Sequence, residues 1–402
     1  MSLPPISKLL DEARTLLPDA VALRRKIHEN PELGLELPET AKAAREAIAD
    51  LGLDVKESRT TSGFVATLRG AKPGPCILLR ADMDALPMPE DTGLPFASRH
   101  ADRMHACGHD VHTAMLAGAA RLLDRHRDAI EGSVQLFFQA GEEGHFGARF
   151  ALDEGLFDGD FCPEAAFAIH VDPRIPVGMT ISKPGPILAA ADTFKIELKG
   201  KGGHASMPHD TRDPLPVACE IVQALQSFVT RRINVFDPIV LTVSKIVAGT
   251  TANVIPETAE CLGTLRSFSP ASRELAHAGL DRVARHVAAA HEVEIEIHIS
   301  RGYPVTVNDE GFTRFAEGVA REVLGAKGFV EMPSAAMGAE DFSYLLERWP
   351  GAMFFLGVRP EDPELVAPCH SNRMVANEEG MAAGIALHTA VALRYLEGRV
   401  SA

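Results

Sequence analysis

Several short segments of this chain combine cysteine, histidine and acidic residues, the types that bind metal ions or transfer protons. The densest segment, residues 104–112, reads Met-His-Ala-Cys-Gly-His-Asp-Val-His. Its Cys107 and His109 offer a thiolate and an imidazole two positions apart, which one borderline-soft metal ion can reach. A solvated, histidine-rich surface loop explains the same residues if the segment stands alone. The other motifs must therefore decide between the two interpretations.

Two aspartates, Asp82 and Asp84, follow an apolar run at 76–80 that is typical of a strand covered on both faces. The ends of such strands in an α/β sheet are the usual place for bound ligands. Each carboxylate can bind a metal directly or orient a histidine that does so. A turn ahead of Pro87 is the alternative for one of the two aspartates.

Two adjacent glutamates, Glu142 and Glu143, follow a second apolar run at 134–139 and are flanked by glycines. Neighbouring side chains at a strand end point in different directions. One glutamate can therefore face a metal while the other faces the substrate as a general base. A charged turn between glycines is the alternative, and we assign the following His145 to the loop.

Two more histidines stand in comparable places. His170 lies near the end of an apolar run at 165–171, and His370 lies in the segment Pro-Cys-His-Ser at 368–371. A single histidine on an apolar strand is more often a core residue than a ligand. Four separate segments that each end in ligand-type residues nevertheless favour a metal centre over coincidence.

A third set of polar residues lies in the middle of the chain. His204 stands among glycines, Asn253 follows Gly-Thr-Thr-Ala, and Arg266 lies in a later strand-like stretch. A histidine, an amide and a guanidinium together can hold an oxyanion and a carboxylate. The alternative is that His204 caps a turn and that Arg266 is an exposed strand charge.

The elements that must position these residues follow from the apolar patterns. Residues 17–49 predict two helices, the second opened by Pro38, and residues 113–123 predict an amphipathic helix. Apolar runs at 63–68, 76–80, 134–139, 165–171 and 353–358 predict strands. Strands that alternate with helices indicate an α/β domain with a central, mostly parallel sheet flanked by helices.

The pattern changes near Pro184-Gly185-Pro186 to strict alternation of apolar and polar residues. Strands at 194–198, 239–246, 258–268 and 293–299, with helices at 214–232 and 272–290, give the order βαββαβ. We therefore predict a smaller α+β, ferredoxin-like domain inserted into the first. The predicted division is 1–187 and 303–402 for the catalytic domain and 188–302 for the insert, a lid or dimerisation domain.

Composition excludes several classes of protein. A net charge of −15 over 402 residues argues against a general nucleic-acid binder, which needs a basic surface. The six cysteines are too scattered for a disulfide framework. The N-terminus lacks the pattern of a secretory signal, and no apolar run reaches the ~18 residues of a membrane span. These features predict a cytoplasmic protein that acts on a small molecule and has no membrane partner.

Taken in order, these segments resemble the metal-dependent amidohydrolase family. That family contains hippurate hydrolases, aminoacylases and plant auxin-conjugate hydrolases, and it is related to dinuclear metallo-carboxypeptidases. The resemblance runs from about Leu23 to His388 and includes Arg24–Leu33 and Met337–Phe342. It implies hydrolysis of the amide bond of N-acyl amino acids by a homodimer or a higher homo-oligomer.

The resemblance also implies roles for individual residues. Two divalent ions (Zn, Mn, Co or Ni) are expected, with Cys107 in place of the bridging aspartate of the peptidase relatives. Glu142 is implied as the general base, His204 as a residue that reaches the partner's active site, and Asp84 as an orienting residue. Asn253 and Arg266 correspond to substrate-binding positions. The metal ligands that the resemblance implies are Cys107, His109, Glu143, His170 and His370.

Three other functions fit parts of the pattern. A dipeptidase or carboxypeptidase can use the same metal centre. A cysteine hydrolase can use Cys107 as nucleophile with His109 as base, and a non-catalytic scaffold can retain the metal alone. His145-Phe146 stands where the relatives often carry more glycine, and the segment before His370 is variable. The acyl group, the amino acid, the native metal and the pathway therefore stay open.

Overall fold

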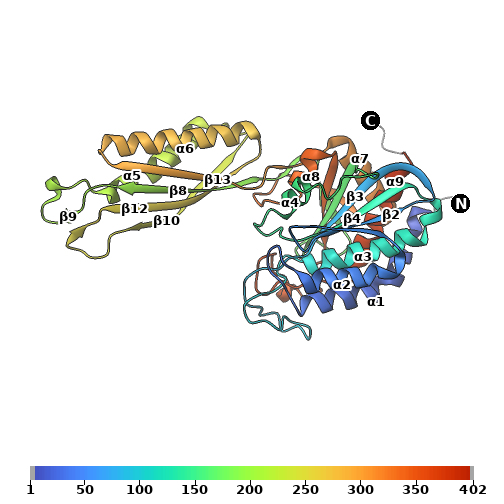
Figure 1. The fold of residues 1–402 in the computed structure, drawn as a ribbon. Coiled ribbons are helices and arrows are strands. Elements are labelled where there is room, and N and C mark those ends of the chain that lie inside the picture. Colours follow the sequence, from blue (N-terminus) through green and yellow to red (C-terminus); the bar gives the residue numbers. More distant parts are fainter. Residues whose placement is uncertain (1–4, 399–402) are drawn as a thin grey trace. The chain divides into compact units, whose positions relative to one another are not determined.

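The computed structural model describes residues 5–398, which form two compact units (Figure 1). Unit 1 comprises the described residues up to Gly185, then Val307–Ser334, and those from Asp341 onward. Unit 2 comprises Pro186–Thr306 together with Ala335–Glu340. This last segment is not part of the predicted insert 188–302. No helix in the described residues combines the length and the apolarity that crossing a membrane requires.

Unit 1 is built on an eight-stranded sheet in the order β1-β2-β4-β3-β5-β16-β6-β15. The predicted α/β class is confirmed, and parallel pairing holds for the four central strands β4, β3, β5 and β16. Beyond these pairings, the pairs β1–β2, β2–β4 and β16–β6 are antiparallel, and the edge pair β6–β15 is parallel. The central strands are apolar on both faces because helices cover both faces. The strands are β1 (Asp54–Glu57), β2 (Phe64–Arg69), β3 (Lys72–Asp82), β4 (Glu131–Gln139), β5 (Ala165–Asp172), β6 (Thr180–Ser182), β15 (Phe329–Glu331) and β16 (Gly351–Gly357).

The helices of unit 1 correct two predictions. The helix predicted at 113–123 begins four residues earlier at His109, and it is buried on nearly all sides rather than amphipathic, because α1, α2 and α9 pack around it. The first helix begins at Leu9 instead of residue 17 and continues through Pro18. α1, α2 and α3 lie together on one side of the sheet (Figure 1). The helices are α1 (Leu9–His28), α2 (Pro38–Ile48), α3 (His109–Arg125), α4 (Gly147–Asp153), α7 (Glu310–Leu324), α8 (Ser343–Arg348) and α9 (Gly380–Leu396).

Unit 2 has the predicted βαββαβ order, with all pairs antiparallel in the order β10-β12-β8-β13. Alternate residues of β8 are buried, which places Phe194, Ile196 and Leu198 under α5 and α6. The two helices cover one face of the sheet (Figure 1), so the ferredoxin-like prediction is confirmed. The main elements are β8 (Ala190–Lys199), α5 (Pro214–Arg232), β10 (Ile239–Ala248), β12 (Thr258–Ser267), α6 (Pro270–Ala290) and β13 (Glu294–Arg301). Short strands are β9 (Gly203–His204) and β11 (Val254–Ile255), with β7 (Gly185–Leu188) and β14 (Thr306–Asn308) at the unit boundaries.

A buried carboxylate joins β8 to α6 inside unit 2. Asp192, 1% exposed, accepts hydrogen bonds from Arg273 Nε at 2.9 Å, from the Gly302 N–H at 3.0 Å and from His277 Nε2 at 2.6 Å. Burial opposes the charged form, but these donors outweigh it and hold the pKa of Asp192 well below its usual range. A carboxylate with a depressed folded-state pKa adds stability above its unfolded pKa of about 4 and loses it as the pH falls.

We therefore predict that Asp192→Asn destabilises unit 2 by about 3 kcal/mol at pH 7, because Arg273 loses its buried counter-charge. This difference in the free energy of unfolding should shrink below about pH 4, because unfolding then allows the Asp192 carboxylate to bind a proton. Urea unfolding followed by circular dichroism at pH 7 and pH 3.5 measures both effects. A difference that is the same at both pH values would contradict this role for Asp192.

Candidate metal centre

The candidate site lies where the central strands of unit 1 end. Strands β4, β3 and β5 are parallel neighbours, and Asp82 of β3 pairs with Gln139, the last residue of β4. On its other side β3 pairs with β5, where Arg80 is opposite Ala168. Parallel strands bring their carboxyl ends to the same edge. The segments that follow β3 and β4, and the last residues of β5, therefore meet at one edge of the sheet.

The segment 104–112 enters this edge through a tight turn at Gly108. Gly108 adopts a left-handed conformation with φ +88°, and a Cβ at this position would lie 2.3 Å from Val171 Cγ2. Glycine is therefore required between the two candidate ligands Cys107 and His109. His109 is buried and is the first residue of α3, the helix that the sequence predicts to begin only at residue 113. The start of a packed helix holds its ring more firmly than a loop would.

One group of candidate ligands comprises Cys107, His109 and His170. Their ligand atoms all lie within 4.8 Å of one another. Cys107 Sγ is 3.3 Å from His170 Nε2, while His170 Nδ1 donates to the Val171 carbonyl at 2.7 Å. That hydrogen bond fixes the proton on Nδ1 and directs the lone pair of Nε2 towards the sulfur.

A second group comprises Cys107, Glu143 and His370, again with all ligand atoms within 4.8 Å. His370 Nε2 lies 3.3 Å from Glu143 Oε1. His370 has a positive φ of 66°, and its N–H donates to the Ala106 carbonyl at 2.7 Å. A left-handed conformation costs a non-glycine residue about 1–2 kcal/mol, so the neighbouring contacts must hold it there. Cys107 is the residue that both groups share.

The charges in this cluster favour a bound cation. Burial opposes protonation of His109, but Asp82, Asp84 and Glu143 outweigh it and raise the pKa of His109 to about 10. The pKa of the Cys107 thiol is raised by its hydrogen bond to Cys369, by burial and by the nearby Glu143 carboxylate. Without metal, bound protons therefore neutralise part of the negative charge of the site. Metal cations would displace these protons when they bind.

The donor atoms themselves fit metal ions. Both ring nitrogens of His109 and Oε1 of Glu143 are buried and lack a well-aligned hydrogen bond, although Asp84 Oδ1 and His370 Nε2 each lie 3.3 Å from one of them. A buried polar atom without a partner costs about 1–3 kcal/mol, which a bound cation would offset. Sulfur, nitrogen and oxygen donors together suit Zn, Mn, Co or Ni. The residues present thus fit divalent metal ions.

Asp84 connects the two glutamates to His109. Its carboxylate accepts the N–H of Glu142 at 3.0 Å through Oδ1 and the N–H of Glu143 at 2.9 Å through Oδ2. Oδ1 also lies 3.3 Å from His109 Nδ1. Glu142 is 6% exposed, and its carboxylate lies within 4.8 Å of the ligand atoms of His109 and Glu143. Asp84 therefore holds the backbone of both glutamates and faces Nδ1 of His109.

We predict that Asp84→Ala lowers metal affinity by about 10–100-fold, because His109 and the backbone of Glu143 lose their fixed orientation. Metal content after dialysis against a chelator series gives the affinity. Asp153→Ala, on the surface of the same unit, serves as the matched control. Unchanged affinity in the Asp84 variant would show that this carboxylate does not orient the site.

Comparison with known proteins identifies the family. Residues 78–394 match the pattern described as Peptidase family M20/M25/M40. The chain belongs to this family. The resemblance inferred from the sequence is confirmed, and this M20 protein is an amide-hydrolysing enzyme for which the family and the donor set support divalent metals.

The names of the relatives of this M20 protein indicate different activities and substrates. It is 36% identical to thermostable carboxypeptidase 1 of Saccharolobus solfataricus over 97% of its own length and 98% of the relative's. It is 39% identical to N-acetyl-L-cysteine deacetylase of Bacillus subtilis (85% and 81% covered) and 38% identical to an Arabidopsis thaliana IAA-amino acid hydrolase (98% and 90%). A solved Bacillus subtilis structure described as a dinuclear metal-binding M20 peptidase superposes with a TM-score of 0.82 at 32% identity, covering 96% and 99% of the chains.

The sequence missed the part played by His112 in this M20 site. His112 Nδ1 donates to Asp82 Oδ1 at 2.6 Å, and Nε2 accepts the Val171 N–H at 2.8 Å. Burial lowers the pKa of His112 to about 4, so its ring is neutral. Both nitrogens already have protein partners, which makes His112 a support for β3 and β5 near the candidate ligands. Its spacing of three from His109, which places both on one face of α3, was the available signal.

The predicted substrate residues lie in unit 2, in two separate places. His204 and Asn253 are close, because β9 pairs with β11 and the Ala205 N–H donates to the Asn253 carbonyl at 3.1 Å. Arg266 lies near the other end of β12, opposite Ala191 of β8. The eight residue steps from Thr258 to Arg266 span about 27 Å of extended strand. Within unit 2, therefore, the structure brings His204 and Asn253 together but not Arg266.

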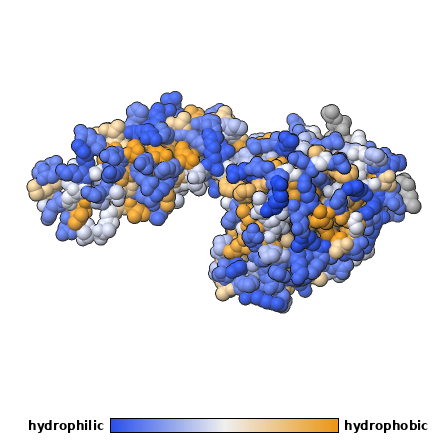
Figure 2. Space-filling model, viewed as in Figure 1, coloured by the Kyte–Doolittle hydropathy of each residue, from blue (hydrophilic) through white to orange (hydrophobic). Residues whose placement is uncertain are grey.

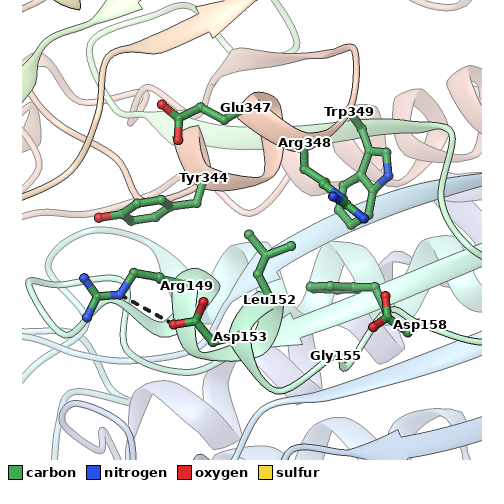
Figure 3. Close-up of a pocket in the computed structure, with 10 residues that line it drawn as sticks. Arg149, Leu152, Asp153, Gly155, Asp158, Tyr344, Glu347, Arg348 and Trp349 are labelled. Atoms are coloured by element: carbon green, nitrogen blue, oxygen red, sulfur yellow. Dashed lines mark ion pairs between the residues drawn. The ribbon is translucent and has the colours of Figure 1, made fainter.

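A separate pocket of about 390 Å³ lies in unit 1 between α4 and α8 (Figure 3). Trp349 and Arg348 lie on one side of it, while Arg149 and Asp153 form a 3.9 Å ion pair on the other. None of the predicted site residues lines this pocket. It is therefore distinct from the cluster around Cys107.

Proposed function

We propose that this M20 enzyme hydrolyses the amide bond of N-acyl amino acids, using two divalent ions held by Cys107, His109, Glu143, His170 and His370. The observation that carries the proposal is the pair of three-residue ligand groups that share Cys107. The names of the deacetylase and IAA-amino acid hydrolase relatives support an N-acyl amino acid as substrate. When bound, such ions supply Lewis-acid chemistry, polarising a carbonyl and making a water molecule more acidic.

Glu142 has the position that a general base requires. Its carboxylate lies within 4.8 Å of ligand atoms of His109 and Glu143, and it is nearly excluded from solvent. In the proposed reaction it removes a proton from the attacking water and later delivers that proton to the leaving nitrogen. The Asp84 carboxylate holds the backbone at Glu142 and thereby keeps the base in place.

The residues of unit 2 are proposed to bind the rest of the substrate. The Ser206 N–H donates to His204 Nδ1 at 3.1 Å, so the proton of the neutral ring lies on Nε2 and can be donated to an oxyanion. Asn253 Oδ1 accepts from Thr251 Oγ1 at 3.2 Å, which leaves its amide N–H groups to donate. Arg266 has no carboxylate within hydrogen-bonding distance in the described part of the chain, which suits a guanidinium that binds the carboxylate of the substrate.

We propose that His204 and Asn253 serve the active site of a second copy of the chain. The strand that separates them from Arg266, about 27 Å long from Thr258 to Arg266, is too long for one small substrate to span. Strand β10 is an edge of its sheet, and unit 2 has apolar side chains at its surface, as Figure 2 shows. The exposed apolar residues in and beside β10 are Val235, Phe236, Val240, Ile246 and Val247. Such an edge favours a homodimer.

A substrate panel tests the proposed function. N-acetyl, N-benzoyl and indole-acetyl amino acids should be hydrolysed, and a chelator should lower the rate by at least about 100-fold until Zn, Mn, Co or Ni is restored. Free dipeptides at the same concentrations are the comparison. Faster cleavage of dipeptides than of every N-acyl amino acid would support the second candidate, a peptidase, which the carboxypeptidase relative favours.

We propose a reducing cytoplasm as the compartment. All six cysteines are free thiols, two of them exposed and four buried or half-buried. A protein that is exported into an oxidising compartment usually carries disulfides instead.

A further inference from the structure

A second thiol lies beside the proposed shared ligand. Cys369 is half-buried, and its thiol is in hydrogen-bond contact with the thiol of Cys107. Its Sγ is also 3.9 Å from the Cys107 carbonyl oxygen and 3.7 Å from that of Val171. The His370 N–H, bonded to the Ala106 carbonyl at 2.7 Å, fixes the two cysteine segments side by side. A disulfide requires the two side chains to face each other, and the contact between the two thiols meets that requirement.

The other four cysteines have no such arrangement. Cys76 and Cys162 donate to backbone carbonyls, and Cys219 and Cys261 lie in unit 2. Cys76 lies near Cys162 and Cys261 lies near Cys219, close enough for an electrostatic effect on the thiol, but within residues 5–398 no hydrogen bond joins the two sulfurs of either pair. Cys162 and Cys219 are more exposed than Cys107 and Cys369. Modification of these two exposed thiols would therefore show that oxidation is not selective for the pair.

We propose that Cys107 and Cys369 are an oxidation site at which a disulfide forms and removes the sulfur ligand from the metal centre. The oxidant is a low-molecular-weight disulfide. The Cys369 thiolate, the more accessible of the pair, attacks one sulfur of the oxidant and expels the first small thiolate. Cys107 then attacks the Cys369 sulfur of this mixed disulfide and expels the second. Two protein thiols lose two electrons and two protons, and the oxidant becomes two thiols.

The effect on activity rests on the proposed function, whereas the disulfide itself does not. A disulfide sulfur lacks the negative charge of a thiolate, which is the form that binds metals. Each of the two ligand groups would then keep only two of its three members. A reductant should reverse the change, because disulfide exchange runs in both directions.

The test uses the full chain in metal-free and Zn-loaded form, each incubated with glutathione disulfide. Thiols are counted after denaturation, and peptides are mapped by mass spectrometry. In the metal-free protein we expect a peptide linking Cys107 to Cys369 and a fall from the six free thiols by two, with Cys162 and Cys219 still reactive. Bound Zn should slow the cross-link at least about tenfold, because it binds only the reduced form. Dithiothreitol should restore all thiols.

Two variants sharpen the test. Cys369→Ser should bind Zn in the same stoichiometry as the native chain and give no linked peptide, while Cys162→Ser should still form the link. The proposal is overturned if Cys162 and Cys219 are modified while Cys107 and Cys369 stay unlinked, or if the link forms only after denaturation. A link that forms equally fast with and without Zn supports the oxidation site and counts instead against Cys107 as a metal ligand.

Discussion

Glu142→Gln is expected to keep the full metal content of the enzyme while turnover falls by at least about two orders of magnitude. Glutamine has nearly the same shape but cannot accept the proton of the attacking water. Asp84 holds residue 142 through its backbone N–H, so the substitution leaves that contact in place. Turnover on an N-acyl amino acid, measured beside metal content by mass spectrometry, checks both parts of the prediction.

The neighbouring glutamate provides the matched control. Glu143→Gln removes a charged oxygen that lies 3.3 Å from His370 Nε2, so it should lose metal as well as activity. The two adjacent substitutions thus separate a base from a ligand. A metal-replete Glu142→Gln enzyme with native turnover would remove Glu142 from its proposed role.

Cys107→Ser is expected to weaken the binding of both ions, with affinity and activity each reduced at least about a hundredfold. Cys107 belongs to both ligand groups, whereas every other proposed ligand belongs to one of them. A serine hydroxyl stays protonated near neutral pH and is a poor substitute for a thiolate. Metal content after dialysis and turnover at saturating metal are the two measurements, and Cys162→Ser is the control.

This variant also separates the metalloenzyme from a cysteine hydrolase. Both accounts predict lost activity, but a nucleophilic Cys107 would leave metal content unchanged and make the native enzyme insensitive to chelators. Cys107 Sγ lies 3.3 Å from His170 Nε2, so His109 is not the only histidine beside this thiol. Full metal content in the serine variant would contradict the shared-ligand role.

Much of the site could be predicted because its residues follow strong local patterns. The apolar runs of β3, β4 and β5 locate the strand ends, and the polar residues beyond them stand where a parallel sheet collects ligands. The glycine between Cys107 and His109 marks a sharp turn, and the structure explains it by the contact with Val171. These patterns lie within short stretches of the sequence, so they can be recognised without knowledge of the tertiary structure.

Other features depend on contacts that the sequence does not reveal. The helix α3 begins at His109 because the left-handed Gly108 allows it, and its sides are buried by helices from both ends of the chain. The predicted helical region begins at residue 17, yet the apolar stripe of Ala13, Leu16 and Ala20 extends α1 from Leu9 through Pro18. The distance between His204 and Arg266 likewise follows from strand register, which no local motif specifies.

The central claim is that two cations share the sulfur of Cys107, and a crystal structure of the Zn-loaded protein with anomalous diffraction tests it most directly. We expect two zinc peaks, each at about 2.3 Å from Cys107 Sγ, one beside His109 and His170 and the other beside Glu143 and His370. A single peak, or two peaks of which either lies out of bonding distance of that sulfur, would contradict the account.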